Sequence, residues 1–260
     1  MLSPETAASA VEAAYGLDLD GSVQVYPSYV NRVYGLRDSE GGGWVVKFYR
    51  PGRWTREAIL EEHDFLADCA AAELPVVQPV EDPEGSTLSE VGLEGRDGEE
   101  LEFLLALFPK SGGRNFEPET EEDWLRLGSL VGRLHGVGRK RPSPHRLTLD
   151  AKLGRAYLRE LLDAQLVHPE SRSEFEDLAT KGLDLAEGRL GGLPLQRIHG
   201  DLHRGNILDR PGRGLVLVDF DDMVQGPAVQ DLWLLLPGRR DECGRELGLL
   251  TEGYEEFSFL

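Results

Sequence analysis

One segment of this chain constrains its fold and its chemistry more than any other. It begins with HGDLHRGN at His199–Asn206, continues through an apolar run at Gly214–Val218, and ends in the acidic stretch Asp219–Asp222. A loop with an aspartate and a later asparagine, followed by a short buried strand that ends in aspartate, is the spacing found in sites that transfer phosphoryl groups. The order of loop, strand and carboxylate therefore predicts a phosphoryl-transfer site.

Each polar residue of this segment has an expected role. Phosphoryl transfer requires the attacking hydroxyl to be positioned and the negative charge on the phosphate oxygens to be neutralised. We expect Asp201 to orient the hydroxyl and accept its proton. Asn206 and Asp219 offer hard oxygen ligands of the kind that suit Mg²⁺. A purely structural alternative is that His199–Asp201 forms a turn, that Asn206 is a cap, and that Asp219–Asp222 is a solvated strand end. This alternative explains each fragment alone but not the order in which they occur together.

Composition limits the class of protein and its partners. The 28 Lys and Arg residues stand against 47 Asp and Glu, a formal net charge of -19. This charge disfavours nucleic acid or an anionic membrane as a partner, because both are bound through cationic side chains. The two cysteines, Cys69 and Cys243, have no disulfide or zinc spacing, and the N-terminus lacks a signal-peptide pattern. We expect a cytoplasmic monomer without nucleic-acid or membrane partners.

Hydrophobic periodicity divides the chain into two lobes. The first, residues 1–108, contains strand patterns and two helices and is predicted to form an antiparallel sheet with a helix against it. Its expected elements are Ser3–Tyr15 and Arg56–Ala72 as helices, and strands within Gly21–Tyr49, at Leu74–Val80, around Ser86–Leu93 and at Leu101–Phe108.

The second lobe is predicted to be mainly helical. A glycine-containing connector at residues 109–113 leads into residues 114–260. Helical patterns cover Glu119–Val137, Ala151–Val167, Ser171–Leu190 and parts of Ala228–Phe257. The predicted class is therefore α+β, and a site between two lobes would suit a nucleotide.

Lys47 is the candidate residue for gripping nucleotide phosphates. It lies in the apolar strand Val45–Phe48, where a charge is costly unless it is paired or points into a site. Its partner should be a glutamate on the following helix. Glu61 and Glu62 both qualify, and we choose Glu62 because its spacing to Phe65 and Leu66 places it beside the apolar stripe.

The turn between the first two strands is a candidate phosphate-contacting loop. No G-x-G-x-x-G sequence is present, and Ser28–Tyr34 takes the corresponding place. Backbone amides with Ser28, Asn31 or Arg32 could contact phosphate. An ordinary hairpin turn explains the same residues. Asp231 is expected to anchor the loop at His199–Asn206 rather than to touch substrate.

Several segments carry a family resemblance. They are Ser28–Tyr34, Val45–Pro51, Arg53–Thr55, Ile59–His63, Gly112–Arg114, His199–Asn206, Val218–Asp222 and Gly226–Trp233. Of these, His199–Asn206 and Val218–Asp222, with the later Asp231, resemble the aminoglycoside phosphotransferase and choline kinase superfamily, whose fold is similar to that of protein kinases. The other segments resemble, within it, the bacterial stress response kinase A family, and this similarity spans roughly residues 21–257.

The resemblance implies a bilobal protein-kinase-like fold and a cytoplasmic serine/threonine protein kinase of the stress response. ATP and Mg²⁺ would be required, with Asp201 as proton acceptor and Asn206 and Asp219 as magnesium ligands. The family continues for several helices beyond a Tyr-Glu-Glu-Phe-Ser segment, whereas this sequence ends shortly after it, at Tyr254–Leu260. We therefore expect the distal helices on the acceptor side to be absent.

Two other functions stay open. A small-molecule kinase acting on an aminoglycoside, choline, homoserine or a similar alcohol would use the same chemical residues and a different acceptor pocket. A nucleotide-binding pseudokinase would have lost some of them. The presence of Lys47, Asp201, Asn206 and Asp219 argues against a pseudokinase.

Overall fold

A computed structural model describes residues 2–94, 100–210, 212–239 and 241–258. The chain forms two compact units. The first unit comprises Met1–Glu117 and Arg204–Asp221, and the second comprises Pro118–His203 and Asp222–Leu260. Residues 204–221 thus belong with the N-terminal part of the chain, and the lobe boundaries at residues 108–114 stay a prediction.

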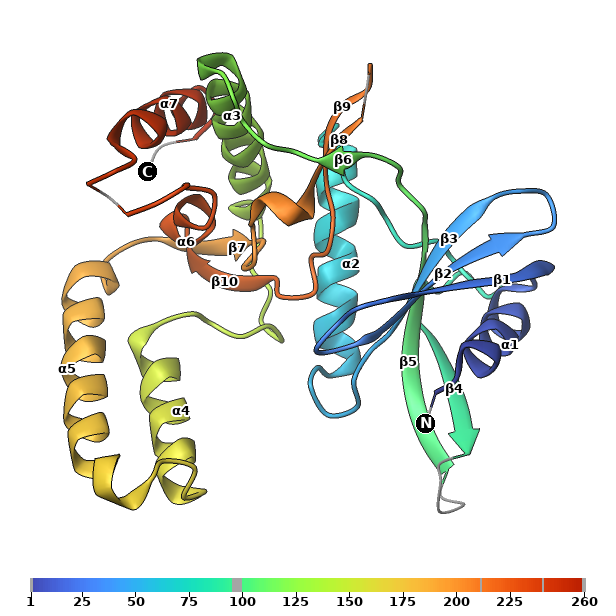
Figure 1. Cartoon of the computed structure of the whole chain (residues 1–260), viewed down its shortest axis with the longest axis horizontal. Coiled ribbons are helices and arrows are strands. Elements are labelled where there is room, and N and C mark those ends of the chain that lie inside the picture. Colours follow the sequence, from blue (N-terminus) through green and yellow to red (C-terminus); the bar gives the residue numbers. More distant parts are fainter. Residues whose placement is uncertain (1, 95–99, 211, 240, 259–260) are drawn as a thin grey trace. The chain divides into compact units, whose positions relative to one another are not determined.

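The first unit is built on a five-stranded antiparallel sheet, in the order β1-β2-β3-β5-β4 (Figure 1). Its strands are β1 (Leu19–Tyr26), β2 (Arg32–Asp38), β3 (Gly43–Phe48), β4 (Ser89–Glu94) and β5 (Glu100–Pro109). The predicted α+β class, with an antiparallel sheet at the N-terminal end, is confirmed.

Helices α1 (Pro4–Tyr15) and α2 (Arg56–Ala71) cover opposite faces of this sheet (Figure 1). Ser3 and Thr55 cap them by accepting hydrogen bonds from the backbone N–H groups of Thr6 and Ala58. Successive strand side chains alternate between faces. Val46 and Phe48 therefore pack with α1, whereas Tyr49 packs with Ile59 of α2. Lys47 points to the same face as Tyr49.

The strand predicted at Leu74–Val80 is wrong. Within it, Val76 makes only an isolated bridge to Leu217, and the N–H of Val80 donates to the carbonyl of Leu107 at 2.8 Å. Pro75 and Pro79 lack the N–H that a continuous ladder needs, so no strand forms here.

A small sheet completes the first unit, in the order β6-β8-β9. Its strands are β6 (Arg114–Asn115), β8 (Ile207–Arg210) and β9 (Gly214–Leu217), and the 3₁₀ turn η2 (Arg204–Asn206) precedes β8. The N–H of Phe116 donates to the carbonyl of Ile207 at 2.9 Å, and the N–H of Leu217 donates to the carbonyl of Pro75 at 2.8 Å. These bonds attach residues 204–221 to the first unit.

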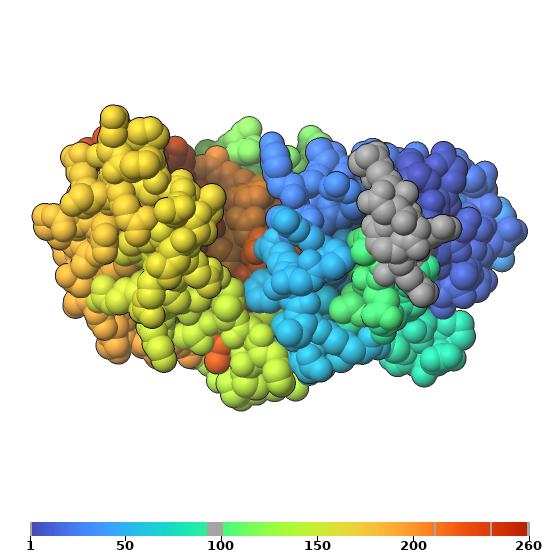
Figure 2. Space-filling view, turned by 90° about the horizontal axis from the view of Figure 1, so that it is seen from below, coloured from blue at the N-terminus to red at the C-terminus, as the bar shows by residue number. Residues whose placement is uncertain are grey.

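The second unit is mainly helical. It contains α3 (Glu121–Gly138), α4 (Ala151–Asp163), the turn η1 (Pro169–Ser171), α5 (Arg172–Leu190), β7 (Leu195–Ile198), β10 (Val224–Pro227), α6 (Val229–Trp233) and α7 (Gly244–Glu255). Strands β7 and β10 pair antiparallel. Helices α4 and α5 lie side by side as a hairpin (Figure 1), which is coloured yellow in Figure 2. Its exposed apolar side chains include Leu161 on α4, Leu166 in the connection and Leu178 on α5.

Helices α3 and α7 cross at very short range because glycines stand at the crossing. A Cβ on Gly253 would lie 2.0 Å from the carbonyl oxygen of Leu125, and one on Gly128 would lie 2.1 Å from that of Leu250. Both obstructing atoms belong to the backbone, so a side chain could be accommodated only by moving a helix.

We expect Gly253→Ala to destabilise the protein by about 1–3 kcal/mol, because the added methyl overpacks the crossing. Gly248→Ala is the matched control in the same helix. A Cβ there meets nothing within 4 Å, so higher helix propensity should stabilise by ~0.5–1 kcal/mol. Urea unfolding of both variants gives the comparison. Equal effects of the two substitutions would refute the close packing at Gly253.

Candidate active site

Asp231 holds the start of the loop His199–His203 in the second unit. Its carboxylate accepts hydrogen bonds from the N–H of His199 at 2.8 Å and from the N–H of Gly200 at 2.9 Å. It also lies 3.0 Å from Nε2 of His135, whose Nδ1 lies 3.1 Å from the Tyr254 hydroxyl. Asp231 therefore anchors this loop, as the sequence predicted.

The buried Asp231 carboxylate is stabilised in its charged form. Burial alone would raise its pKa, but the hydrogen bond and the charge of His135, the charge of His199 and the bond from Gly200 outweigh that effect. The pKa of Asp231 is consequently lowered. An ionised carboxylate accepts only, which suits the two N–H donors that it faces.

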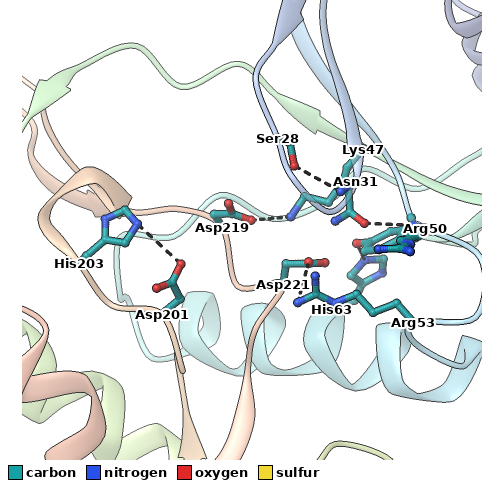
Figure 3. Close-up of polar contacts among 11 residues, drawn as sticks. Ser28, Asn31, Lys47, Arg50, Arg53, His63, Asp201, His203, Asp219 and Asp221 are labelled. Carbon is teal, nitrogen blue, oxygen red and sulfur yellow. Dashed lines mark hydrogen bonds and ion pairs between the residues drawn. The ribbon is translucent and has the colours of Figure 1, made fainter. Parts of the chain in front are cut away.

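Asp201 follows the anchored residues and its carboxylate is accessible. Gly200 has a φ of +85°, and a Cβ there would lie 2.0 Å from the carbonyl oxygen of Asp222. Only glycine fits, and the sharp turn that it makes leaves the Asp201 side chain 46% exposed. Nε2 of His203 lies 3.6 Å from Oδ2 of Asp201 (Figure 3). An accessible carboxylate in a fixed loop can accept a proton from a bound hydroxyl.

A cavity of about 470 Å³ lies in the first unit. Its volume is in the range of small-molecule sites. Residues from the large sheet, from α2 and from the β8–β9 region form its walls, in which apolar side chains alternate with polar and charged ones. The lining residues are Tyr26, Val33, Val45, Lys47, Glu62, Leu66, Val77, Phe108, Pro109, Lys110, Ser111, Asn115, Gly205, Asn206, Leu208, Val218, Asp219 and Phe220.

Lys47 and Asp219 form an ion pair in this cavity. Nζ of Lys47 lies 2.7 Å from Oδ1 of Asp219 (Figure 3). Burial disfavours the Lys47 charge, but the carboxylates of Asp219, Glu62 and Asp221 outweigh it and raise the pKa of Lys47. The ammonium also lies 5.8 Å from the ring centroid of Phe108, within cation–π range. Lys47 is therefore a fixed positive charge at one end of the cavity.

Asp219 has an unusual backbone conformation. Its φ is +63°, in the left-handed region that few non-glycine residues adopt. Both sides of the residue are fixed. The N–H of Val218 donates to the carbonyl of Asn206 at 3.0 Å, Phe220 packs edge-on against Phe65 of α2, and Asp221 pairs with Arg53 at 3.8 Å (Figure 3). Such strain persists only where the surroundings impose it, and it is typical of functional sites.

Asn206 and Asp219 fit a magnesium site. Both line the cavity, and the bond between Asn206 and Val218 holds their backbones side by side. They offer one amide and one carboxylate oxygen donor. Within the described ranges, no group of three or more His, Cys, Asp and Glu side chains could hold a metal. Few protein ligands are what Mg²⁺ requires when substrate phosphates and water supply the rest.

The structure brings together four of the predicted site residues. Lys47, Glu62, Asn206 and Asp219 line the cavity, and Glu62 is only 1% exposed. Asp201 belongs to the second unit.

The turn residues Ser28, Asn31 and Arg32 are placed differently. None of them is among the lining residues of the cavity. Asn31 is buried, and its Oδ1 accepts from the N–H of Arg50 at 3.1 Å, while Oγ of Ser28 accepts from the N–H of Asn31 at 3.3 Å (Figure 3). Arg32 is exposed on β2. These contacts give Ser28 and Asn31 a role in holding the turn, and their phosphate contact stays a prediction.

Sequence reasoning missed several cavity residues. Tyr26, Lys110, Ser111 and Asn115 all line the cavity without belonging to a motif. For Tyr26, the signal that could have revealed it is strand alternation. Tyr26 pairs with Val33, Val33 pairs with Lys47, and cross-strand partners share a face of the sheet.

Comparison with known proteins agrees with this geometry. Residues 22–259 match the Phosphotransferase enzyme family. The chain belongs to this family. Among curated members, it is 36% identical over 270 residues to the stress response kinase A of Escherichia coli strain K12, covering 99% of this chain and 75% of that protein. It is also 36% identical over 263 residues to the serine/threonine protein kinase RdoA of Salmonella typhimurium, with the same coverages.

Solved structures of other proteins share the fold. Amicoumacin kinase in complex with AMP-PNP, Ca²⁺ and amicoumacin gives a TM-score of 0.75 at 20% identity, covering 98% of this chain and 78% of that one. Spectinomycin phosphotransferase with ADP and spectinomycin gives 0.66 at 14% identity, covering 98% and 80%. The predicted kinase-like fold is confirmed. Among the described residues, no helix is long and apolar enough to span a membrane.

Proposed function

We propose that this phosphotransferase is an ATP- and Mg²⁺-dependent serine/threonine protein kinase of a bacterial stress response. The observation that carries the proposal is the cavity in which Lys47, Glu62, Asn206 and Asp219 converge. It supports a site for a nucleotide with its phosphates near Lys47. The names of the curated relatives, stress response kinase A and serine/threonine protein kinase RdoA, favour a protein as acceptor.

Each residue has a defined task in the proposed reaction. Lys47, flanked by Glu62, binds phosphate oxygens of ATP. Asn206 and Asp219 would hold Mg²⁺, which supplies positive charge to the phosphate oxygens when it is bound. The carboxylate of Asp201 takes the proton from a serine or threonine hydroxyl. That hydroxyl oxygen bonds to the γ-phosphorus, the bond between this phosphorus and the β–γ bridging oxygen breaks, and ADP leaves with the electron pair.

Chain connectivity limits how far the proposed base can lie from the proposed metal ligand. Asp201 and Asn206 are five residues apart, so an extended chain could separate their Cα atoms by roughly 18 Å at most. The turn η2 shortens that distance further.

We also propose that the chain has two functional lobes, residues 1–108 and residues 114–260, joined by a connector at residues 109–113. We propose in addition that the protein is a cytoplasmic monomer that binds neither nucleic acid nor membrane. Sedimentation would test the monomer.

A small alcohol is the second candidate acceptor. The observation that favours it is the fold shared with kinases named for amicoumacin, spectinomycin and aminopropanol. The catalytic residues would be identical. The two candidates differ only in which hydroxyl receives the phosphoryl group.

The test is transfer of labelled γ-phosphate from ATP with Mg²⁺ to proteins and to a panel of small alcohols. We expect Asp201→Asn to reduce transfer by about 10²–10⁴-fold, because the proton acceptor is lost. ATP affinity should be unchanged, since Asp201 does not line the cavity. Asp177→Asn, an exposed carboxylate on α5, is the control and should keep full activity.

The outcomes separate the candidates. Asp201-dependent label on serine or threonine of a protein supports the kinase proposal. Label on a small alcohol alone would move the enzyme to the second candidate. If the Asp201→Asn variant transferred phosphate at the wild-type rate, Asp201 could not be the base. If the wild-type protein bound ATP without transferring phosphate to any acceptor, it would be a pseudokinase.

A further inference from the structure

Three side chains form a bridge at the rim of the cavity. Nζ of Lys110, just after β5, lies 5.7 Å from the ring centroid of Tyr26 and 3.2 Å from Oε1 of Gln24. The Tyr26 hydroxyl donates to the same Oε1 at 3.2 Å. Tyr26 and Lys110 both line the cavity. We call Gln24, Tyr26 and Lys110 the rim bridge.

The rim bridge crosses two strands that carry glycine where it passes. A Cβ on Gly35 of β2 would lie 2.9 Å from the ring of Tyr26, and one on Gly43 of β3 would lie 3.2 Å from Cβ of Lys110. Glycine weakens a strand, and its presence often marks a close approach by another group. These two glycines leave the space in which Tyr26 and Lys110 reach across the sheet.

The register of the sheet places two members of the rim bridge further along the cavity wall than Lys47. Tyr26 pairs with Val33 and is level with Lys47, whereas Gln24 pairs with Gly35 and is level with Val45, two residues further on. Lys110 follows β5, four residues beyond Ala106, the partner of Lys47, or roughly 14 Å along the backbone at strand spacing. The Lys110 ammonium is held at Gln24, so it faces the part of a bound nucleotide beyond the phosphates that Lys47 would hold.

The side chains of the cavity wall indicate which part of the nucleoside each would contact. Val45, Phe108 and Val218 offer apolar surfaces that suit the flat faces of a base. Lys110 is exposed and its ammonium has three donors and no acceptor. A ribose hydroxyl offers acceptor lone pairs at the wet edge of such a site.

We propose that the rim bridge binds the ribose of the nucleotide, with Lys110 donating to a ribose hydroxyl, and that it sets the preference for ribonucleotides. The inference rests on the proposed ATP site and adds its specificity-determining residues. Lys110 is already held by Gln24 and Tyr26, so its ammonium is placed before the nucleotide arrives. Little side-chain freedom is then lost on binding.

Lys110→Met tests the proposal, because it keeps the aliphatic stem over Gly43 and removes the donor. Calorimetry would compare ATP, 2′-deoxy-ATP and 3′-deoxy-ATP on the wild type and the variant. We expect the variant to bind ATP about three- to tenfold more weakly, the worth of one hydrogen bond. It should bind at least one deoxynucleotide as well as it binds ATP, whereas the wild type discriminates.

Two further variants sharpen the result. Lys181→Met removes an exposed lysine on α5 and should leave nucleotide binding unchanged. Gly35→Ala keeps every charge but displaces the Tyr26 ring, so it should weaken ATP binding in the same direction as Lys110→Met.

Two results would overturn the inference. One is a wild-type protein that binds ATP and both deoxynucleotides equally, and the other is a Lys110→Met variant that retains the wild-type discrimination. A wild-type protein that binds no ATP at all would instead reject the proposed function and this inference with it.

Discussion

Asp231→Ala should lower the free energy of unfolding by about 3–5 kcal/mol, the usual cost of removing one partner from a buried charged network. The carboxylate is fully buried and accepts from the N–H groups of His199 and Gly200. Alanine would leave both donors and His135 without this acceptor in a site that water does not reach. Urea unfolding measures the change, and phosphotransfer should fall with it because the loop before Asp201 loses its anchor.

The same carboxylate predicts a pH dependence. Because the pKa of Asp231 is lowered in the folded protein, its stabilising contribution is complete above the ordinary aspartate pKa of about 4 and is lost as pH falls through the folded-state value. Asp231→Asn cannot titrate. The stability difference between wild type and Asp231→Asn should therefore be constant near neutral pH and shrink below about pH 4.

A surface aspartate provides the control for both measurements. Asp163→Ala alters an exposed residue of α4 and should change stability by less than ~0.5 kcal/mol. If Asp231→Ala were no more destabilising than Asp163→Ala, the anchoring network would contribute nothing to folding. A difference from Asp231→Asn that stayed the same in acid would show that the carboxylate titrates normally.

Asp219→Ala should reduce phosphotransfer by about 10³-fold, which corresponds to roughly 4 kcal/mol of lost transition-state stabilisation from a metal-bound phosphate. The substitution removes a proposed magnesium ligand. It also removes the carboxylate that lies 2.7 Å from Nζ of Lys47. Steady-state kinetics should show that added Mg²⁺ restores little activity, because the ligand itself is missing. Removal of Mg²⁺ by chelation should abolish wild-type activity in the same assay.

Asp209→Ala is the matched control for Asp219→Ala. Asp209 lies on β8 of the same small sheet, pairs with Arg114 at 3.9 Å, and does not line the cavity. Its removal should leave kcat and the Mg²⁺ dependence unchanged. If the Asp219→Ala variant transferred phosphate at the wild-type rate, Asp219 would be excluded from the proposed chemistry.

Much of the cavity could be predicted because its residues lie in local patterns. The strand around Lys47 is apolar on both sides of the lysine, and the spacing of Phe65 and Leu66 correctly predicted that Glu62 lies beside the buried stripe of α2. The segment from Asn206 to Asp219 was recognisable from its order of loop, strand and carboxylate.

Long-range geometry could not be predicted in the same way. The ion pair between Lys47 and Asp219 joins residues 172 positions apart, and the positive φ of Asp219 depends on packing that no local pattern contains. The predicted strand at Leu74–Val80 is a different case, because Pro75 and Pro79, which prevent a continuous ladder there, are visible in the sequence. Gly35 and Gly43, over which Tyr26 and Lys110 pass, carry no local signal of those side chains.

The interleaved path of the chain has a consequence for how such an enzyme can diversify. The first unit takes residues from two separate stretches, and the cavity draws on both of them. No single continuous piece of gene encodes the cavity, so it cannot be passed to another protein by a simple exchange of segments. Within the described part of the chain, residues 118–203 and 222–260 do not line the cavity. Apart from Asp201 and its anchor Asp231, these residues can therefore vary without changing the side chains of the cavity wall.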